Sequence, residues 1–111
     1  MSGKHLGEFE QIVLLSLIRL NENAYGAAIR QLLHELIGRD VAIGALYSTL
    51  ERMEKKGLVA SKLGEATAER GGRAKRFFSI TAEGQSALKR ARNAMDTMWQ
   101  GVSIFTGVRA L

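Results

Sequence analysis

The chain has 111 residues, of which 46% are hydrophobic, and it carries a formal net charge of +5 at pH 7. This length predicts one small domain, and the excess of positive charge favours an acidic partner. The absence of cysteine excludes disulfides, thiolate zinc sites and a cysteine nucleophile. The N-terminus lacks the apolar run of a signal peptide, and no apolar segment is long enough to span a bilayer. We therefore expect a soluble cytoplasmic protein that makes no membrane contact.

The positive charge is concentrated between Arg52 and Arg92. This segment contains eleven Lys and Arg against four Glu, a net charge of +7, whereas the rest of the chain has a net charge of −2. The expectation of an acidic partner therefore rests mainly on this segment.

Residues 7–20 are predicted to form a helix that is apolar on two sides, because Ile12 and Leu15 fall opposite the broad face that includes Phe9. We expect one side to pack on its own domain and the other on a second subunit or a later helix. After a polar break, a second helix is predicted over residues 25–37. Asn23 is its expected N-cap and Gly38 its left-handed C-terminal residue.

A connection of only a few residues leads to a third helix over residues 41–57, and two helices joined so tightly indicate a helix-turn-helix unit. The apolar stripe of the third helix comprises Ile43, Leu46, Tyr47, Leu50 and Met53. Its other face carries small, hydroxylated and basic residues: Gly44, Ala45, Ser48, Thr49, Arg52, Lys55 and Lys56. Small residues let a helix lie deep in a DNA groove, and cations suit phosphates. An ordinary amphipathic surface helix with a solvated basic face has the same pattern.

A two-stranded hairpin is predicted next, with strands at 58–63 and 76–80. The connecting loop is rich in glycine, and the arm leading out of it is basic through Arg70, Arg73, Lys75 and Arg76. A basic hairpin directly after a recognition helix is placed to grip the DNA backbone or the minor groove. A solvated hairpin tip is the alternative.

The last predicted helix begins after its cap, Thr81, and extends to about Phe105. Apolar residues recur in it at heptad spacing, which favours pairing with the first helix or with a symmetry mate. The predicted dimer interface comprises Ile12, Leu15, Leu88, Ala91, Met95, Met98, Val102 and Phe105. The cluster around Trp99, the only tryptophan, is either simple core or part of an interface pocket for a flat apolar ligand. Phe9, Leu15, Met98 and Trp99 would line that pocket.

The order of these elements is that of a winged helix-turn-helix protein, a mainly α fold with a small β hairpin (α+β). We divide it into a DNA-binding domain, residues 1–80, and a C-terminal dimerisation helix, residues 81–111, packed with helix 7–20. Four segments resemble the PadR family of transcriptional regulators, in its shorter branch with a single C-terminal helix. They are LGEFEQIVLLSLIRL, AYGAAIRQLL, IGALYSTLERMEKKGLV and GGRAKRFFSIT.

The resemblance implies a homodimer that represses from a palindromic operator in double-stranded DNA and is released by a small molecule or another signal. It also implies that Tyr47 touches the sugar-phosphate backbone, although a core tyrosine with its hydroxyl at the surface fits the stripe equally well. By the same resemblance, Ala45, Ser48 and Thr49 face bases, and Lys75 and Arg76 are the basic pair of the wing. The chain departs from the family at Ala42, where a capping Ser or Thr is usual.

Two further function classes compete with that of a DNA-binding regulator. An interaction module that binds an acidic protein would use the same basic wing, but its hot spot would show aromatic residues at the start of the third helix. An enzyme is not expected, because no nucleophile is paired with a base at a recognisable spacing. His5 and His34 lack a second ligand at metal spacing, so neither a metal site nor a cofactor is expected.

Overall fold

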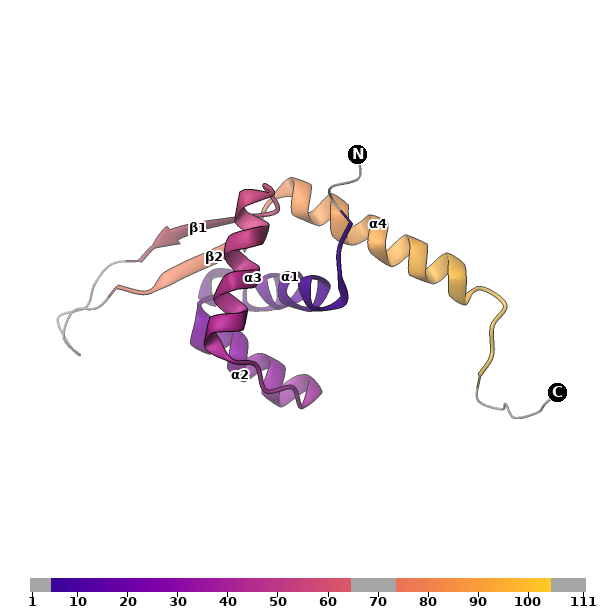
Figure 1. Cartoon of the computed structure of the whole chain (residues 1–111), viewed down its shortest axis with the longest axis horizontal. Coiled ribbons are helices and arrows are strands. Elements are labelled where there is room, and N and C mark those ends of the chain that lie inside the picture. The colour runs from indigo at the N-terminus through magenta and orange to yellow at the C-terminus, as the bar shows by residue number, and fades with distance from the viewer. Residues whose placement is uncertain (1–4, 65–73, 105–111) are drawn as a thin grey trace.

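The computed structural model describes residues 5–64 and 74–104 (Figure 1). Three helices come first: α1 (Glu8–Leu20), α2 (Gly26–Ile37) and α3 (Ile43–Lys55), with a 3-10 turn, η2 (Asn21–Asn23), between the first two. Two antiparallel strands, β1 (Val59–Leu63) and β2 (Arg76–Ile80), form the wing, and α4 (Ala82–Trp99) follows. This arrangement confirms the predicted mainly helical fold with a two-stranded wing.

The core lies where the first three helices meet the base of the wing. Its largest fully buried side chains include Leu14 of α1, Ile29 of α2, Leu46 and Leu50 of α3, and Phe78 of β2. The helices α1 to α3 and both strands therefore contribute to one apolar cluster, and this burial fixes α3 against the rest of the domain. Figure 1 shows α3 crossing in front of α1, with the wing extending to one side.

The start of α2 differs from the prediction. Asn23 belongs to the 3-10 turn, and the N-cap of α2 is Tyr25, which makes no side-chain capping bond. The reason is tertiary: Tyr25 forms an isolated antiparallel bridge with Phe77, and the Phe78 amide donates to the Ala24 carbonyl at 2.8 Å. The backbone before α2 thus pairs with the free edge of β2 instead of entering the helix early.

The turn between α2 and α3 begins at the C-cap of α2 and ends at the N-cap of α3. Gly38 ends α2 in the left-handed conformation, with φ of 63°, as predicted. Ala42 stands at the N-cap of α3 without a side-chain hydrogen bond, which agrees with the departure noted at this position. No side-chain cap therefore sets the start of α3. Ile43, its first residue and the first member of the predicted apolar stripe, is 41% exposed, so the buried part of the stripe begins at Leu46.

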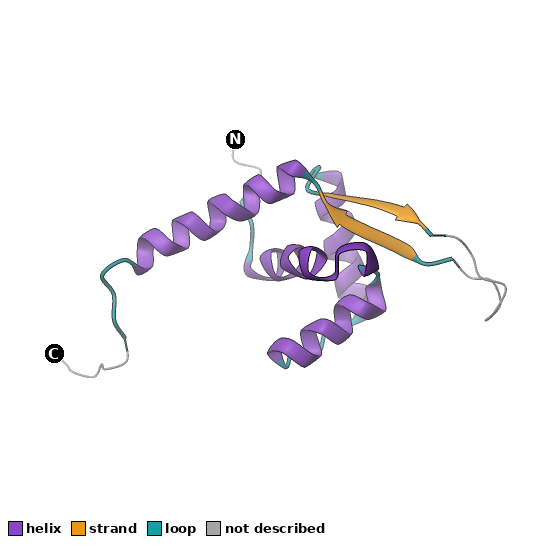
Figure 2. Cartoon of the chain, turned by 180° about the vertical axis from the view of Figure 1, so that it is seen from behind, coloured by secondary structure: helices purple, strands orange, loops and turns teal. Residues whose placement is uncertain are grey.

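The last helix is shorter than predicted. Thr81 caps it by accepting a hydrogen bond from the Gly84 amide at 3.0 Å, but α4 ends at Trp99 and Gly101 adopts a φ of 75°. Val102 therefore lies beyond the helix, so the predicted heptad does not continue through it, and Phe105 lies outside the described residues. Figures 1 and 2 both show the C-terminal half of α4 projecting away from the body, opposite the wing.

Candidate nucleic-acid interface

The outward face of α3 presents small and polar residues to solvent. Gly44, Ala45, Ser48, Arg52 and Lys55 are all exposed, as expected for a face that lies in a groove. The position of Thr49 differs from the prediction that it faces a base. Only 5% of its surface is exposed, so it belongs to the packed side of α3 and is not placed to read a base. Thr49 is three positions after Leu46 and four positions before Met53. Both of these residues are fully buried, and this helical spacing brings Thr49 onto the same inner stripe.

Tyr47 lies partly in the core, which is one of the two positions that the sequence left open. Its ring packs partly into the core, with its centroid 6.0 Å from that of Phe78. Its hydroxyl reaches the first turn of α2, where a Cβ added at Gly26 would lie 2.6 Å from Oη. Glycine at position 26 is therefore required for this approach. The half-buried ring fixes the hydroxyl at the junction of α2 and α3, beside backbone amides that no side chain caps.

The cations near the end of α3 lie beside a buried carboxylate. Glu10 of α1 is 8% exposed, and its Oε1 accepts the Gly7 amide at 2.9 Å. Its Oε2 lies 3.6 Å from both Arg52 Nε and Lys56 Nζ. Arg52 is half exposed, so its guanidinium stays accessible to a polyanion while Nε lies beside the Glu10 carboxylate. Lys56 is less exposed, with 34% of its side-chain surface accessible to solvent.

Lys75 and Arg76, the basic pair of the wing, point in different directions. Successive residues of an extended strand point to opposite faces. Lys75 is exposed and places its ammonium 4.2 Å from the centroid of the Tyr25 ring, at the start of α2. Arg76 points instead toward α3, where Nη2 lies 3.0 Å from Glu54 Oε1. The other two basic residues expected in the wing, Arg70 and Arg73, lie outside the described residues.

The residues predicted for the dimer interface fall into two groups. Ile12, Leu88 and Ala91 pack partly against the core of their own chain. Leu15, Met95 and Met98 are exposed, and so is Val102 beyond the helix. Of the residues expected to line a ligand pocket, Phe9 packs against the core, whereas Leu15, Met98 and Trp99 are 47%, 73% and 50% exposed. In a single chain each of these three side chains is therefore open to solvent.

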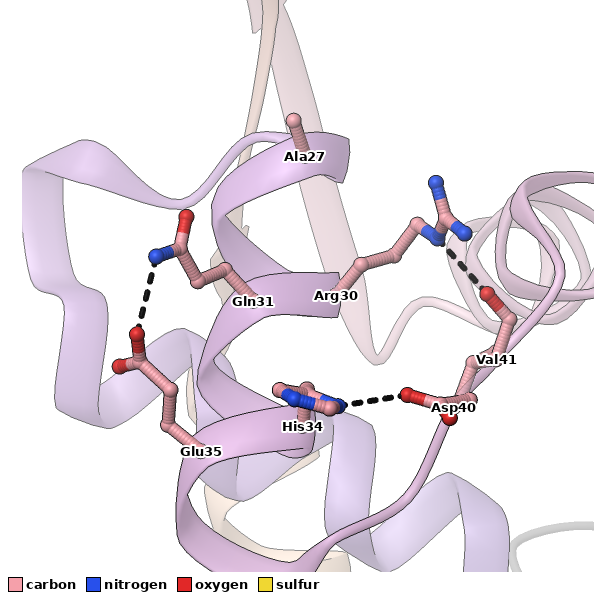
Figure 3. Close-up of a pocket in the computed structure, with 7 residues that line it drawn as sticks. All are labelled: Ala27, Arg30, Gln31, His34, Glu35, Asp40 and Val41. Carbon is pink, nitrogen blue, oxygen red and sulfur yellow. Dashed lines mark hydrogen bonds and ion pairs between the residues drawn. The ribbon is translucent and has the colours of Figure 1, made fainter.

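A polar hollow of about 330 Å³ lies elsewhere, between α2 and the turn before α3 (Figure 3). Arg30 Nε donates to the Val41 carbonyl at 2.7 Å, and His34 Nδ1 lies 2.6 Å from Asp40 Oδ1. These two contacts tie the turn of the helix-turn-helix unit back to α2. Within residues 5–64 and 74–104, no group of three or more His, Cys, Asp or Glu side chains is placed to hold a metal ion.

Sequence reasoning missed the acidic residues that organise these cations. A local signal existed for Glu10, because a Glu three residues after a helix N-cap commonly accepts the N-cap amide. No local signal existed for Glu54 and Ser61, whose partner Arg76 is 22 and 15 residues away.

The described part of the chain also contains no helix long and apolar enough to cross a membrane.

Several solved structures share this fold. A PadR-like transcription factor from Bacteroides fragilis matches with a TM-score of 0.71 and 23% identity, covering 83% of this chain and 84% of that one. A PadR family regulator from Eggerthella lenta matches with a TM-score of 0.67 and 26% identity over 92% and 88% of the two chains. A third, a PadR family regulator from Clostridium difficile, has a TM-score of 0.68 and 22% identity, over 89% and 99%.

A comparison with curated protein sequences found no match. The family model described as "Transcriptional regulator PadR-like family" matches residues 14–90, which run from the middle of α1 through the wing into α4. This match covers the helix-turn-helix unit and both strands, and it places the chain among DNA-binding regulators rather than enzymes. The chain belongs to the PadR-like family of transcriptional regulators.

Proposed function

We propose that the protein is a sequence-specific, dimeric repressor that binds a palindromic operator. The observation that carries the proposal is the exposed face of α3, where Gly44, Ala45 and Ser48 offer close approach and Arg52 and Lys55 add charge at its far end. A hydroxyl and two small side chains read base edges by shape, by contact with a thymine methyl and by hydrogen bonding, rather than by an Arg to guanine pair.

Backbone contacts supply most of the binding free energy in this proposal. Lys75 lies beside the start of α2, and the Tyr47 hydroxyl lies at the same helix end, which supports contact of both with one phosphate strand. Arg70 and Arg73, which lie between the two strands in sequence and outside the described residues, would add further phosphate contacts in this proposal.

The dimer uses the apolar surface that the single chain leaves open. Leu15 of α1 and Met95 and Met98 of α4 would be covered by the same elements of a second copy, together with Ile12, Leu88 and Ala91 at the edge. In this division, residues 1–80 form the DNA-binding domain and residues 81–111 supply dimerisation. Two half-sites then lie about one helical turn apart.

Release by a small molecule would act through this interface. Trp99 is 50% exposed beside Met98 and supplies a flat aromatic surface, and Phe9 and Leu15 would complete a pocket for an apolar or aromatic effector. Because Trp99 is the only tryptophan, its fluorescence reports on such binding directly.

The test is fluorescence anisotropy of labelled duplexes, one random and one from the region upstream of the protein's own gene, at low and moderate salt. We expect salt-dependent binding with preference for one duplex, and Ser48→Ala should change that preference. Lys75→Ala should weaken both duplexes similarly and lower the salt slope by about one phosphate contact. Failure of both duplexes to bind at low salt would reject DNA binding and favour an acidic protein partner.

A further inference from the structure

Arg76 lies in a closed polar triangle that joins the wing to the recognition helix. Its Nη2 donates to Glu54 Oε1 of α3 at 3.0 Å, and its Nε and Nη2 donate to Ser61 Oγ of β1 at 3.2 and 3.1 Å. Ser61 Oγ in turn donates to Glu54 Oε2 at 2.9 Å. Each side of the triangle is therefore a hydrogen bond, and its corners belong to α3, β1 and β2.

The triangle uses every hydrogen-bonding site of the Ser61 hydroxyl. A serine hydroxyl has one donor and two acceptor sites, and here Ser61 uses the donor for Glu54 and accepts twice from Arg76. The Arg76 guanidinium also lies 5.3 Å from the centroid of the buried Phe78 ring. The planar guanidinium is thus fixed by an aromatic face and a carboxylate together, a geometry that lysine does not reproduce.

The strand register explains why these groups meet. Leu63 pairs with Arg76 and Ser61 pairs with Phe78, so Ser61 lies diagonally across the ribbon from Arg76 on the same face. That face is turned toward α3, where Glu51 Oε2 is a second carboxylate 4.0 Å from Arg76 Nη1. The charge of Arg76 is therefore directed toward these two carboxylates, while 38% of its side chain stays exposed.

We propose that Arg76 is a positioning residue: with Glu54 and Ser61 it fixes the wing relative to α3, so that helix and wing meet the duplex as one rigid unit. This inference rests on the proposed DNA binding for its consequence, but its structural part holds without DNA. It assigns Arg76 a role different from Lys75, its neighbour in the basic pair, which remains exposed.

Three substitutions separate positioning from direct phosphate contact when random-duplex affinity is measured against salt concentration. If Arg76 contacts phosphate and Glu54 only neutralises it, Glu54→Gln should tighten binding and Arg76→Lys should change little. Positioning predicts the reverse: Glu54→Gln, Arg76→Lys and Ser61→Ala each weaken binding about tenfold with an unchanged salt slope. Tighter binding by Glu54→Gln, or a smaller slope in Arg76→Lys, would overturn the proposal.

A measurement without DNA tests the structural part by itself. The chain has no cysteine, so Gln31→Cys and Lys62→Cys, both at exposed positions on α2 and β1, create the only labelling sites for two nitroxides. Labelled chains are diluted with unlabelled chains, so that pulsed electron resonance reports the distance within one chain. We expect one narrow distribution that broadens or shifts in Glu54→Gln and in Ser61→Ala.

Ser79→Ala is the matched control, because Ser79 is an exposed serine of β2 outside the triangle. It should leave both the distance distribution and DNA affinity unchanged. An unchanged distribution in Ser61→Ala and Glu54→Gln would reject the positioning role even if DNA binds. Conversely, a broadened distribution in a protein that binds no duplex would support the triangle and reject only the proposed function.

Discussion

At the scale of single residues, glycine occupies α2 and α3 for two different reasons. Gly26 is buried and leaves room for the Tyr47 ring, whereas Gly44 is exposed and a Cβ there would meet nothing within 4 Å. The first glycine is explained by packing inside the chain. The second has no explanation within the chain, which is what close approach to an external partner predicts.

Gly44→Ala therefore separates stability from binding. Alanine favours the helical conformation, so we expect the free energy of unfolding to rise by about 0.5 kcal/mol in urea denaturation. DNA affinity should nevertheless fall, because the added methyl enters the proposed groove. Gly38→Ala is the control: it is equally uncrowded but has φ of +63°, so it should lower stability by about 1 kcal/mol. Unchanged DNA affinity in Gly44→Ala would place the groove elsewhere.

Gly26→Ala should lower the free energy of unfolding by about 1–3 kcal/mol, measured in the same denaturation experiment. The new Cβ would lie 2.6 Å from Tyr47 Oη and 2.9 Å from Cζ, and the ring has little freedom to retreat because it packs beside Phe78. Tyr47→Phe in the same chain removes the closer of these two contacts and should recover part of the loss. Full stability of Gly26→Ala would contradict this position of the ring.

At the scale of elements, α4 is joined to the wing by a short and well-bonded corner. Thr81 accepts the Gly84 amide and also donates to the Gly57 carbonyl at 2.7 Å. Gly84 packs directly against the Leu58 carbonyl oxygen, where a Cβ would overlap it. The direction in which α4 leaves the body is therefore fixed by its first turn, before its apolar stripe begins.

Removing this cap should weaken the corner measurably. We expect Thr81→Ala to lower the free energy of unfolding by about 1–2 kcal/mol, because both the cap and the bond to Gly57 are lost, whereas Thr81→Ser should retain most of it. Ser86→Ala, at an exposed position within α4, supplies a hydroxyl deletion outside the corner and should change little. Equal stability of Thr81→Ala and Ser86→Ala would show that the cap is energetically unimportant.

In the whole molecule, α1 and α4, which are distant in sequence, both leave apolar side chains exposed in the single chain. Leu15 and Ile18 of α1 are about half exposed, and Met95, Met98 and Trp99 of α4 are exposed to at least the same degree. The half of α4 that carries these residues projects beyond the body in both views (Figures 1 and 2). Covering this surface with a second copy is the simplest way to remove it from water.

A charge placed on this surface should oppose dimerisation. We expect Met98→Glu to shift sedimentation equilibrium toward monomer and to weaken operator binding, because two half-sites are no longer bound together. Asn93→Glu adds the same charge to an exposed polar position of α4 and should leave the association state unchanged. A dimer that survives Met98→Glu with its original dissociation constant would place the interface elsewhere.

The order and type of the elements could be predicted from the amino-acid sequence, because periodicity, glycine caps and basic clustering are local properties. The sequence predicted the second strand at residues 76–80, the cap at Thr81 and the left-handed Gly38, and each is present. It also predicted the outward position of Ser48 on α3 from helical spacing alone. These features follow from residues that are close together in the chain.

Which side chains these elements turn inward depends in part on contacts between distant residues. Tyr25 rather than Asn23 is the N-cap of α2 because it pairs with the wing, and Arg76 turns toward Glu54. Both outcomes depend on a partner many residues away, so no local pattern contains them. The burial of Thr49, in contrast, follows from its spacing to Leu46 and Met53 in the same helix. The helices and strands could be predicted from local patterns. Which basic residues fix the wing and which stay available to a polyanion depends on tertiary packing.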